Sequence, residues 1–199
     1  SFIVFRGSDS HISPGGAIRV ITSSDHEQWE LVHEESKVAC DLRDPKVTTL
    51  GNQLFVYFAQ FNTDRSFRSR VITSSDGRHF DEPAELQGIP DNYWLWHVKS
   101  LEDVLYGAAY TSVNELSEAA IFRSEDGLTW DKLLEFPKPA NEVYIDFDHQ
   151  NQLWALVRSD PWGSIPSVCV AEPPYASLKS VLRLPIRLQG PMLKRADHG

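Results

Sequence analysis

The feature that most constrains this chain is a seven-residue string, Arg-Val-Ile-Thr-Ser-Ser-Asp, which occurs at 19–25 and again at 70–76. A relaxed copy, Ile-Phe-Arg-Ser-Glu-Asp, occupies 121–126. The aspartates of the three copies lie 51 and 50 residues apart, at Asp25, Asp76 and Asp126. A fixed period of this length indicates a repeat architecture, in which each repeat is one supersecondary unit. The repeat therefore takes precedence over any local interpretation.

Around the repeated string, short apolar runs alternate with turn-forming residues, a pattern that predicts β-strands joined by tight turns. We expect units of four short strands at approximately 1–36, 44–88, 94–137 and 142–185, and residues 190–199 as the start of a further unit or a closing strand. No segment of about ten residues shows the apolar spacing of a helix, so no helix is expected in place of the strands. Such units are typical of propeller blades, whereas a two-sheet sandwich does not predict near-identical turns at a constant offset.

Three stretches carry more local expectations. The charged stretch 41–45 is expected to connect the first unit to the second. Residues 80–86 are expected to form an edge strand, the position at which Pro83 is tolerated. Residues 191–195 resemble the first strand of another unit.

The repeated turn has a sufficient structural explanation. The aspartate of a Ser-x-Asp turn accepts backbone N–H groups within the turn, and Gly77 and Gly127 supply a positive φ at no steric cost. An aromatic residue follows each aspartate by four positions and is expected to pack against neighbouring strands. We therefore expect a structural rather than catalytic role for nine residues: Ser23, Asp25, Trp29, Ser74, Asp76, Phe80, Ser124, Asp126 and Trp130.

The third copy, Ser124-Glu-Asp-Gly-Leu-Thr-Trp130, resembles the Asp box (BNR repeat) of sialidases, or neuraminidases, and related β-propellers. The second copy departs only at its aromatic residue, Phe80, and the first copy lacks the glycine. The resemblance covers about 1–184. It implies an all-β, sialidase-like propeller of four-stranded antiparallel blades, with about four of six blades present. It is weaker for activity, because Asp boxes also occur in propellers that are not sialidases.

Two accounts of the chain's extent stay open. The chain begins with Ser1-Phe2 inside an apolar run, which suggests a truncated N-terminus and leaves the compartment undetermined. We favour a fragment of a six-bladed protein. Alternatively, residues 190–195 supply the missing strand of the first blade and close a small four-bladed ring, which would remove exposed strand edges.

Composition argues against binding to nucleic acid, association with membranes and metal binding. The formal net charge of −9 argues against a nucleic-acid partner and against adsorption to anionic membranes. No apolar run reaches the roughly 18 residues that a membrane span needs. The two cysteines, Cys40 and Cys169, are expected to be buried free thiols. No zinc-type ligand spacing appears, so neither a metal nor another cofactor is expected.

The candidate site lies at the ends of the strands opposite the repeated turns. Glu142 follows Asn141, and Arg158 ends the next expected strand sixteen residues later. This resembles a sialidase segment in which the glutamate partners a tyrosine nucleophile and the arginine binds the substrate carboxylate. The planar fork of arginine suits that task. The structural alternative is a simple ion pair between the two side chains.

The first unit offers a comparable set. Arg6 resembles the arginine that precedes the sialidase acid/base loop, and the loop that follows offers Asp9 and then His11. The resemblance implies an acid/base aspartate there, so a histidine near that place departs from the family pattern. Histidine can perform acid–base work near neutral pH. The structural alternatives are an arginine at a strand end and a solvated loop histidine.

Four further residues are candidates for substrate contact. Arg43 and Asp44 belong to the charged stretch, although an arginine between two aspartates is also typical of a buried structural pair. Trp96 and Trp162 could stack on a sugar ring, although a tryptophan at the start of a blade also serves core packing. Acids, arginines and aromatic rings together are what a carbohydrate site requires.

Three functions stay open. The first is a sialidase-like exo-glycosidase with a carbohydrate ligand, whose tyrosine nucleophile lies beyond this chain. The second is a non-catalytic glycan-binding or scaffold propeller. The third is a glycosidase that uses a carboxylate pair such as Asp44 and Glu142, which requires the two groups to lie within roughly 5–9.5 Å.

Overall fold

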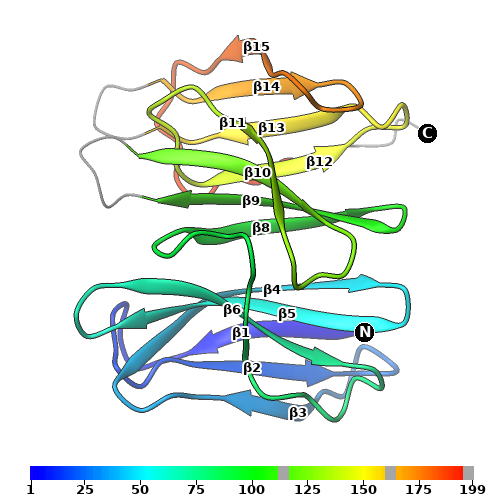
Figure 1. The fold of residues 1–199 in the computed structure, drawn as a ribbon. Coiled ribbons are helices and arrows are strands. Elements are labelled where there is room, and N and C mark those ends of the chain that lie inside the picture. Colours follow the sequence, from blue (N-terminus) through cyan, green and yellow to red (C-terminus); the bar gives the residue numbers. More distant parts are fainter. Residues whose placement is uncertain (112–116, 160–164, 195–199) are drawn as a thin grey trace. The chain divides into compact units, whose positions relative to one another are not determined.

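The computed structural model describes residues 1–111, 117–159 and 165–194, and its regular elements in those ranges are all β-strands. They form one three-stranded and three four-stranded antiparallel sheets, whose strands neighbour one another in chain order (Figure 1). The predicted all-β class and antiparallel four-stranded unit are confirmed. Within the described ranges there is no helix of the length and hydrophobicity needed to cross a membrane.

The strands have the following bounds. The first sheet contains β1 (Phe2–Gly7), β2 (Ala17–Thr22) and β3 (Glu30–Glu35). The second contains β4 (Cys40–Leu50), β5 (Gln53–Asn62), β6 (Phe67–Ser74) and β7 (Ala84–Glu85). The third contains β8 (Trp94–Leu101), β9 (Val104–Thr111), β10 (Glu118–Ser124) and β11 (Asp131–Glu135). The fourth contains β12 (Val143–Phe147), β13 (Leu153–Val157), β14 (Ser167–Ala171) and β15 (Lys179–Arg183).

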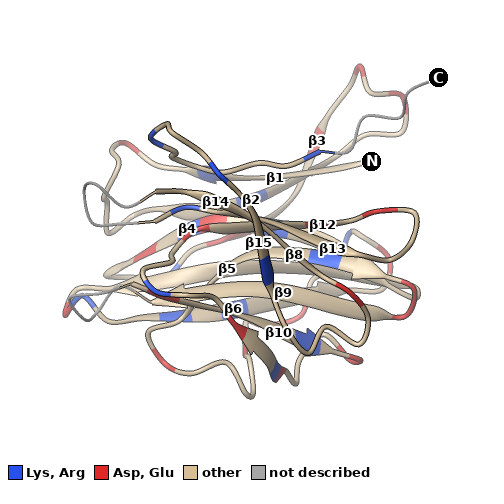
Figure 2. Ribbon diagram, turned by 90° about the horizontal axis from the view of Figure 1, so that it is seen from above, with Lys and Arg blue, Asp and Glu red and all other residues tan. Residues whose placement is uncertain are grey.

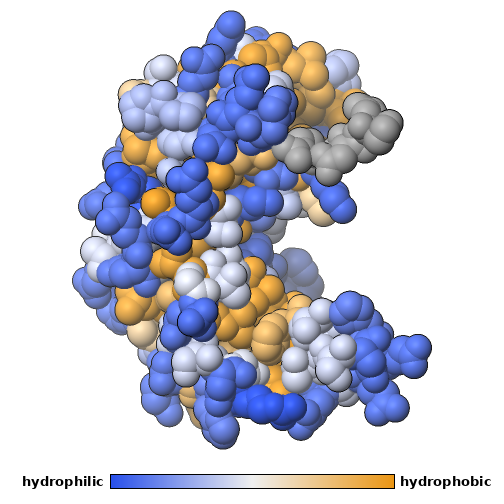
Figure 3. Space-filling model, turned by 90° about the vertical axis from the view of Figure 1, so that its right-hand side faces the viewer, coloured by the Kyte–Doolittle hydropathy of each residue, from blue (hydrophilic) through white to orange (hydrophobic). Residues whose placement is uncertain are grey.

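The chain divides into two compact units, residues 1–95 with 126–129, and residues 96–125 with 130–199. Each unit has its own apolar cluster. The first includes Ile18, Leu42 and Val56, and the second includes Ile121 and Ile145. Both cysteines are buried and free, as expected. Charged residues of both signs are interspersed along the strands and loops (Figure 2), and Figure 3 shows hydrophobic residues in separate patches among hydrophilic ones.

One hydrogen-bond pattern recurs in the three Ser-x-Asp turns. In each turn one carboxylate oxygen, that of Asp25, Asp76 or Asp126, accepts the backbone N–H groups two and three residues further on, at 2.7–2.9 Å. These N–H groups hold the pKa of Asp25 below its usual range, chiefly that of Gln28. In the first turn His26, at φ 64°, takes the left-handed conformation that glycine takes in the other two copies.

The structure differs from the sequence-based expectation in four places. Residues 41–45 are part of β4 rather than a connector, because Cys40 and Leu42 are buried in the first core. The expected strand 80–86 is reduced to β7, since Pro83 lacks the N–H that a ladder needs. Residues 191–194 are not in a strand. Trp29 stays 37% exposed, whereas Trp130 is 1% exposed.

The four-bladed ring closure is also not observed. The sheet β1-β2-β3 has no fourth strand in the described part of the chain. Residues 191–194, which were expected to supply it, are irregular, and the last expected strand residue, Arg195, lies outside the described ranges.

The packing of the third turn against Phe55 can be tested by comparing two glycines that both have a positive φ. At Gly127 (φ 77°) a Cβ atom would lie 2.4 Å from the Phe55 ring, whereas at Gly51 (φ 55°) it would meet nothing within 4 Å. We expect Gly51→Ala to lower the free energy of unfolding by about 1–2 kcal/mol through backbone strain alone. Gly127→Ala should cost about 1–3 kcal/mol more because of overpacking. Urea denaturation measures both, and equal losses would contradict this account.

Candidate functional site

A buried carboxylate connects the end of β1 to the start of β4 in the first unit. Asp41 is 3% exposed, and its Oδ1 accepts hydrogen bonds from Nε and Nη2 of Arg6 at 2.9 and 2.7 Å. The backbone N–H of Ser13 donates to Oδ2 at 3.1 Å, and Arg6 Nη1 donates to the Ser10 carbonyl at 3.1 Å. A buried carboxylate is tolerated only when it is paired and hydrogen-bonded. These bonds therefore fix Arg6 and the loop that follows it.

A close backbone approach makes this arrangement possible. Leu42 N–H donates to the carbonyl of Gly16 at 3.1 Å, which holds that glycine against the carboxylate. A Cβ atom at Gly16 would lie 1.9 Å from Asp41 Oδ1 and 2.9 Å from Arg6 Nε. The glycine is thus required by the ion pair rather than by a turn.

Arg43 and Asp44 follow directly on β4. The Arg43 guanidinium lies 5.5 Å from the centre of the Trp94 ring, and its Nη2 lies 3.3 Å from Nε2 of His11. Its Nε lies 3.9 Å from Asp41 Oδ2. Asp44 has a φ of 46° within the β-bulge that separates Arg43 from Lys46. Bulges of this kind redirect a side chain, and strained backbone of this kind clusters at functional sites.

The second unit contains the pair formed by Glu142 and Arg158. These residues continue the β12–β13 ladder beyond Val143 and Val157, and Arg158 N–H donates to the Glu142 carbonyl at 3.0 Å. Arg158 Nη1 lies 2.5 Å from Glu142 Oε1, and the backbone N–H of Gly190 donates to Oε2 at 3.0 Å. Both side chains are mostly buried, at 19% and 13% exposure. Cross-strand neighbours of opposite charge stabilise a sheet in this way.

Aromatic and charged pairs connect β8 to other strands of the same unit. The His97 ring stacks on Tyr144 with centroids 3.9 Å apart, and Lys99 Nζ lies 2.8 Å from Asp146 Oδ1. Trp96 packs edge-on against Tyr110 of β9 at 5.9 Å. Tyr144 follows Glu142 by two positions, so both side chains project to the same face of the strand.

The structure thus brings together some of the predicted site residues and not others. Arg6, Arg43 and His11 share the surroundings of Asp41, and Glu142 contacts Arg158. Asp9 is exposed, and no partner of its carboxylate is seen among the described residues. Trp162 lies outside the described residues.

Sequence reasoning named Asp41 beside Arg43 as a possible buried pair but missed it as the partner of Arg6. It also missed Gly16 and Gly190. For Asp41 a signal existed, since Cys40 and Leu42 are apolar while Asp41 and Arg43 are charged. This alternation is the period of a half-buried strand. In the described part of the chain, no group of three or more His, Cys, Asp and Glu residues could hold a metal ion.

Comparison with known proteins extends this description. No family model matches the sequence, and no curated protein matches it. Among solved structures, a protein of unknown function from Dyadobacter fermentans DSM 18053 has a TM-score of 0.76 at 12% identity, over 94% of this chain and 66% of its own. A Hadza microbial sialidase has a TM-score of 0.73 at 16% identity, over 91% of this chain and 43% of its own.

A third solved structure belongs to another class of glycosidase. The GH32 β-fructofuranosidase of Bombyx mori, in complex with sucrose, has a TM-score of 0.65 at 16% identity, over 90% of this chain and 45% of its own. The fold is propeller-like and similar to that of these two glycosidases. The chain spans less than half the length of these two enzymes, and identities this low bear on the fold alone.

The Asp41 ion pair yields a stability prediction with a matched control. Asp41→Asn leaves the largely buried Arg6 without its counter-charge, so we expect the free energy of unfolding to fall by about 3 kcal/mol. Glu34→Gln removes the exposed partner of Arg19 and should cost less than about 1 kcal/mol. Chemical denaturation compares the two variants. A loss at Asp41 no larger than that at Glu34 would show that the buried pair does not hold β1 and β4 together.

Proposed function

We propose that this chain is part of a sialidase-like exo-glycosidase that releases terminal acidic sugars from glycoconjugates. The observation that carries the proposal is the pair of Glu142 and Arg158, held at adjoining strand ends in a fold that resembles a sialidase. The Asp-box resemblance of the three turns supports the same class. The nucleophile of such an enzyme belongs to the part of the protein outside this chain.

In this proposal Arg158 binds the carboxylate of the sugar. Its guanidinium has five N–H donors in a planar fork. It can therefore keep the 2.5 Å contact with Glu142 and donate to a substrate carboxylate as well. Glu142 is fixed by Gly190 and Arg158, and its role is to activate a tyrosine supplied by the rest of the enzyme. A covalent route through tyrosine is the exception to the usual two-carboxylate mechanism of glycosidases.

The residues of the first unit have distinct proposed roles. Arg6 is held by Asp41, so it orients the loop that carries Asp9 and His11 and has fewer donors left for a ligand. Arg43 always donates, so the Nε2 of His11 that faces it acts as an acceptor, and the proton lies on Nδ1. In this arrangement Arg43 occupies the one lone pair of the ring, so His11 takes up a proton only after that contact is released. Asp9 is therefore the proposed proton donor.

An acidic-sugar test separates Arg158 from other arginines. We expect N-acetylneuraminic acid to shift the NMR signals of amides near 141–143 and 157–159 in this chain. Arg158→Gln should weaken that binding at least about tenfold, because a charge-assisted bidentate contact is lost. Arg123→Gln, which removes an exposed arginine of β10 paired with Glu125, should leave it unchanged. Equal binding by all three proteins would exclude Arg158 as the carboxylate ligand.

The same chain should not turn over substrate. We expect no release of fluorophore from a fluorogenic sialoside, since the tyrosine nucleophile of the proposed mechanism is not in this chain. Robust turnover would contradict the proposed division of the catalytic residues. The assay is informative only beside a folded control, which the thermal unfolding transition of the same sample provides.

A non-catalytic glycan-binding propeller is the second candidate. It is favoured by the internal carboxylate partners of Arg6 and Arg158, which leave a complete ion pair in each unit without a ligand. The sequence of the full open reading frame discriminates between the two functions. An arginine and a tyrosine at matching blade positions beyond residue 199 favour the enzyme, and their absence favours binding.

The carboxylate-pair glycosidase is a third candidate, favoured by the strained Asp44 and by similarity to the GH32 enzyme. If Asp44 serves catalysis, Asp44→Gly should abolish hydrolysis of a β-fructoside by the full-length protein. It should not lower the free energy of unfolding, since glycine accepts a φ of 46° without strain. Full activity of that variant would remove this candidate.

A further inference from the structure

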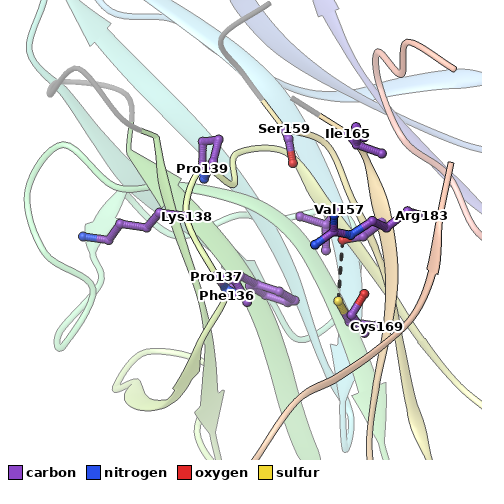
Figure 4. Close-up of a pocket in the computed structure, with 11 residues that line it drawn as sticks. Phe136, Pro137, Lys138, Pro139, Val157, Ser159, Ile165, Cys169 and Arg183 are labelled. Atoms are coloured by element: carbon purple, nitrogen blue, oxygen red, sulfur yellow. Dashed lines mark hydrogen bonds between the residues drawn. The ribbon is translucent and has the colours of Figure 1, made fainter. Parts of the chain in front are cut away.

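A cavity of about 280 Å³ lies in the second unit, and neither Glu142 nor Arg158 is among the residues that line it. Its walls come from segment 136–139, the end of β13, and strands β14 and β15 (Figure 4). Ligand sites for drug-sized molecules range from about 300 to 1,000 Å³. The cavity therefore suits a small molecule rather than a polymer.

The charge of this cavity is opposite to that of the protein. The described residues that line it include Lys138 and Arg183 but no Asp or Glu. The chain as a whole carries a formal net charge of −9. Three other cavities among the described residues each include at least one carboxylate, for example Asp146, Glu35 or Asp41. A local excess of positive charge in an acidic protein favours an anionic ligand.

Arg183 is the cation that is left to bind such a ligand. Lys138 already forms an ion pair with Glu118. Arg183 pairs with Ser167 in the β14–β15 ladder, but its side chain has no hydrogen-bond or ion-pair partner in the described part of the chain. Its guanidinium points toward Val157 in Figure 4. A guanidinium fork matches a carboxylate with two parallel hydrogen bonds.

Polar and apolar groups around Arg183 complement this anchor. The hydroxyls of Ser159, Ser167 and Ser180 line the cavity and can donate further hydrogen bonds. Ser167 also contacts the thiol of Cys169 at 3.7 Å, the dashed line in Figure 4. Burial raises the pKa of the Cys169 thiol, so the sulfur stays protonated and adds no competing negative charge.

Strand alternation separates this cavity from the pair of Glu142 and Arg158. Val157 and Ser159 line the cavity, whereas Arg158 between them reaches Glu142. Successive side chains of an extended chain point to opposite sides. The cavity is therefore a different site from the one in the proposed function. The Arg158 guanidinium lies on the opposite side of the strand from the cavity.

We propose that this cavity binds a small organic carboxylate, with its anionic group on Arg183 and the serine hydroxyls and its apolar part against Phe136, Pro137, Pro139 and Ile165. The three serines supply neutral donors, which suit a singly charged anion. The apolar walls require a carbon skeleton, so an inorganic anion would leave them uncovered.

The test uses benzoate as the probe and benzamide as its neutral counterpart, each titrated into the full chain by NMR at constant ionic strength. We expect benzoate, but not benzamide, to shift amides in 136–139, 157–159 and 165–183. Arg183→Gln should weaken benzoate binding at least about tenfold, which corresponds to about 1.4 kcal/mol. Lys179→Gln removes an exposed cation of the same strand that does not line the cavity, and should change binding less than about twofold.

A second variant keeps the charge but fills the space. Ser180→Phe places a ring at an exposed lining position on the edge strand β15, so it should preserve folding and abolish benzoate binding. Three results would overturn the proposal. They are the absence of benzoate binding to the parent chain, equal binding by the Arg183→Gln variant, and shifts centred on Glu142 and Arg158. Equally tight binding of benzamide and benzoate would also overturn it, because it would show that the cavity recognises the apolar ring and not the anionic group.

Discussion

Three turns of this chain depend on one carboxylate oxygen each. In every copy that oxygen accepts two consecutive backbone N–H groups, which have no partner in a strand. Because these bonds close each exposed turn on itself, the aspartate helps to determine the path of the chain from one strand into the next. The third turn adds a further constraint, since the Tyr57 hydroxyl donates to the Gly127 carbonyl at 2.8 Å. In the first three sheets, the connection between the last two strands follows from a turn that is closed in this way.

The same hydrogen bonds explain why the most visible motif is a poor candidate for chemistry. A carboxylate that already accepts two or three hydrogen bonds, with its pKa held low, is a weak base. Two largely buried charged pairs lie at the opposite strand ends, Arg6 with Asp41 in one unit and Arg158 with Glu142 in the other. Loops and strand ends on a rigid scaffold are the usual location of binding residues.

The sequence predicted what depends on local patterns and missed what depends on distant partners. The turns and the strand alternation were visible because each involves residues within a few positions of one another. The repeat was visible because its string recurs almost unchanged about 50 residues further on. The bond between Arg6 and Asp41 joins residues 35 apart, and that between Gly190 and Glu142 joins residues 48 apart. No periodicity encodes such contacts. His26 is an intermediate case, since the turn predicts a positive φ there but not that histidine would adopt it.

Arg158 and Arg183 of the second unit differ in whether an anionic ligand must compete with a carboxylate of the protein. Arg158 is 19% exposed and already holds Glu142, so an incoming anion must share the guanidinium with a carboxylate 2.5 Å away. The negative charge of Glu142 lowers the affinity of Arg158 for a second carboxylate, unless another part of the enzyme donates a hydrogen bond to Glu142, for example from a tyrosine hydroxyl. The proposed catalytic arrangement supplies such a donor. The Arg183 side chain has no carboxylate partner among the described residues, so a small anion would not have to share its guanidinium.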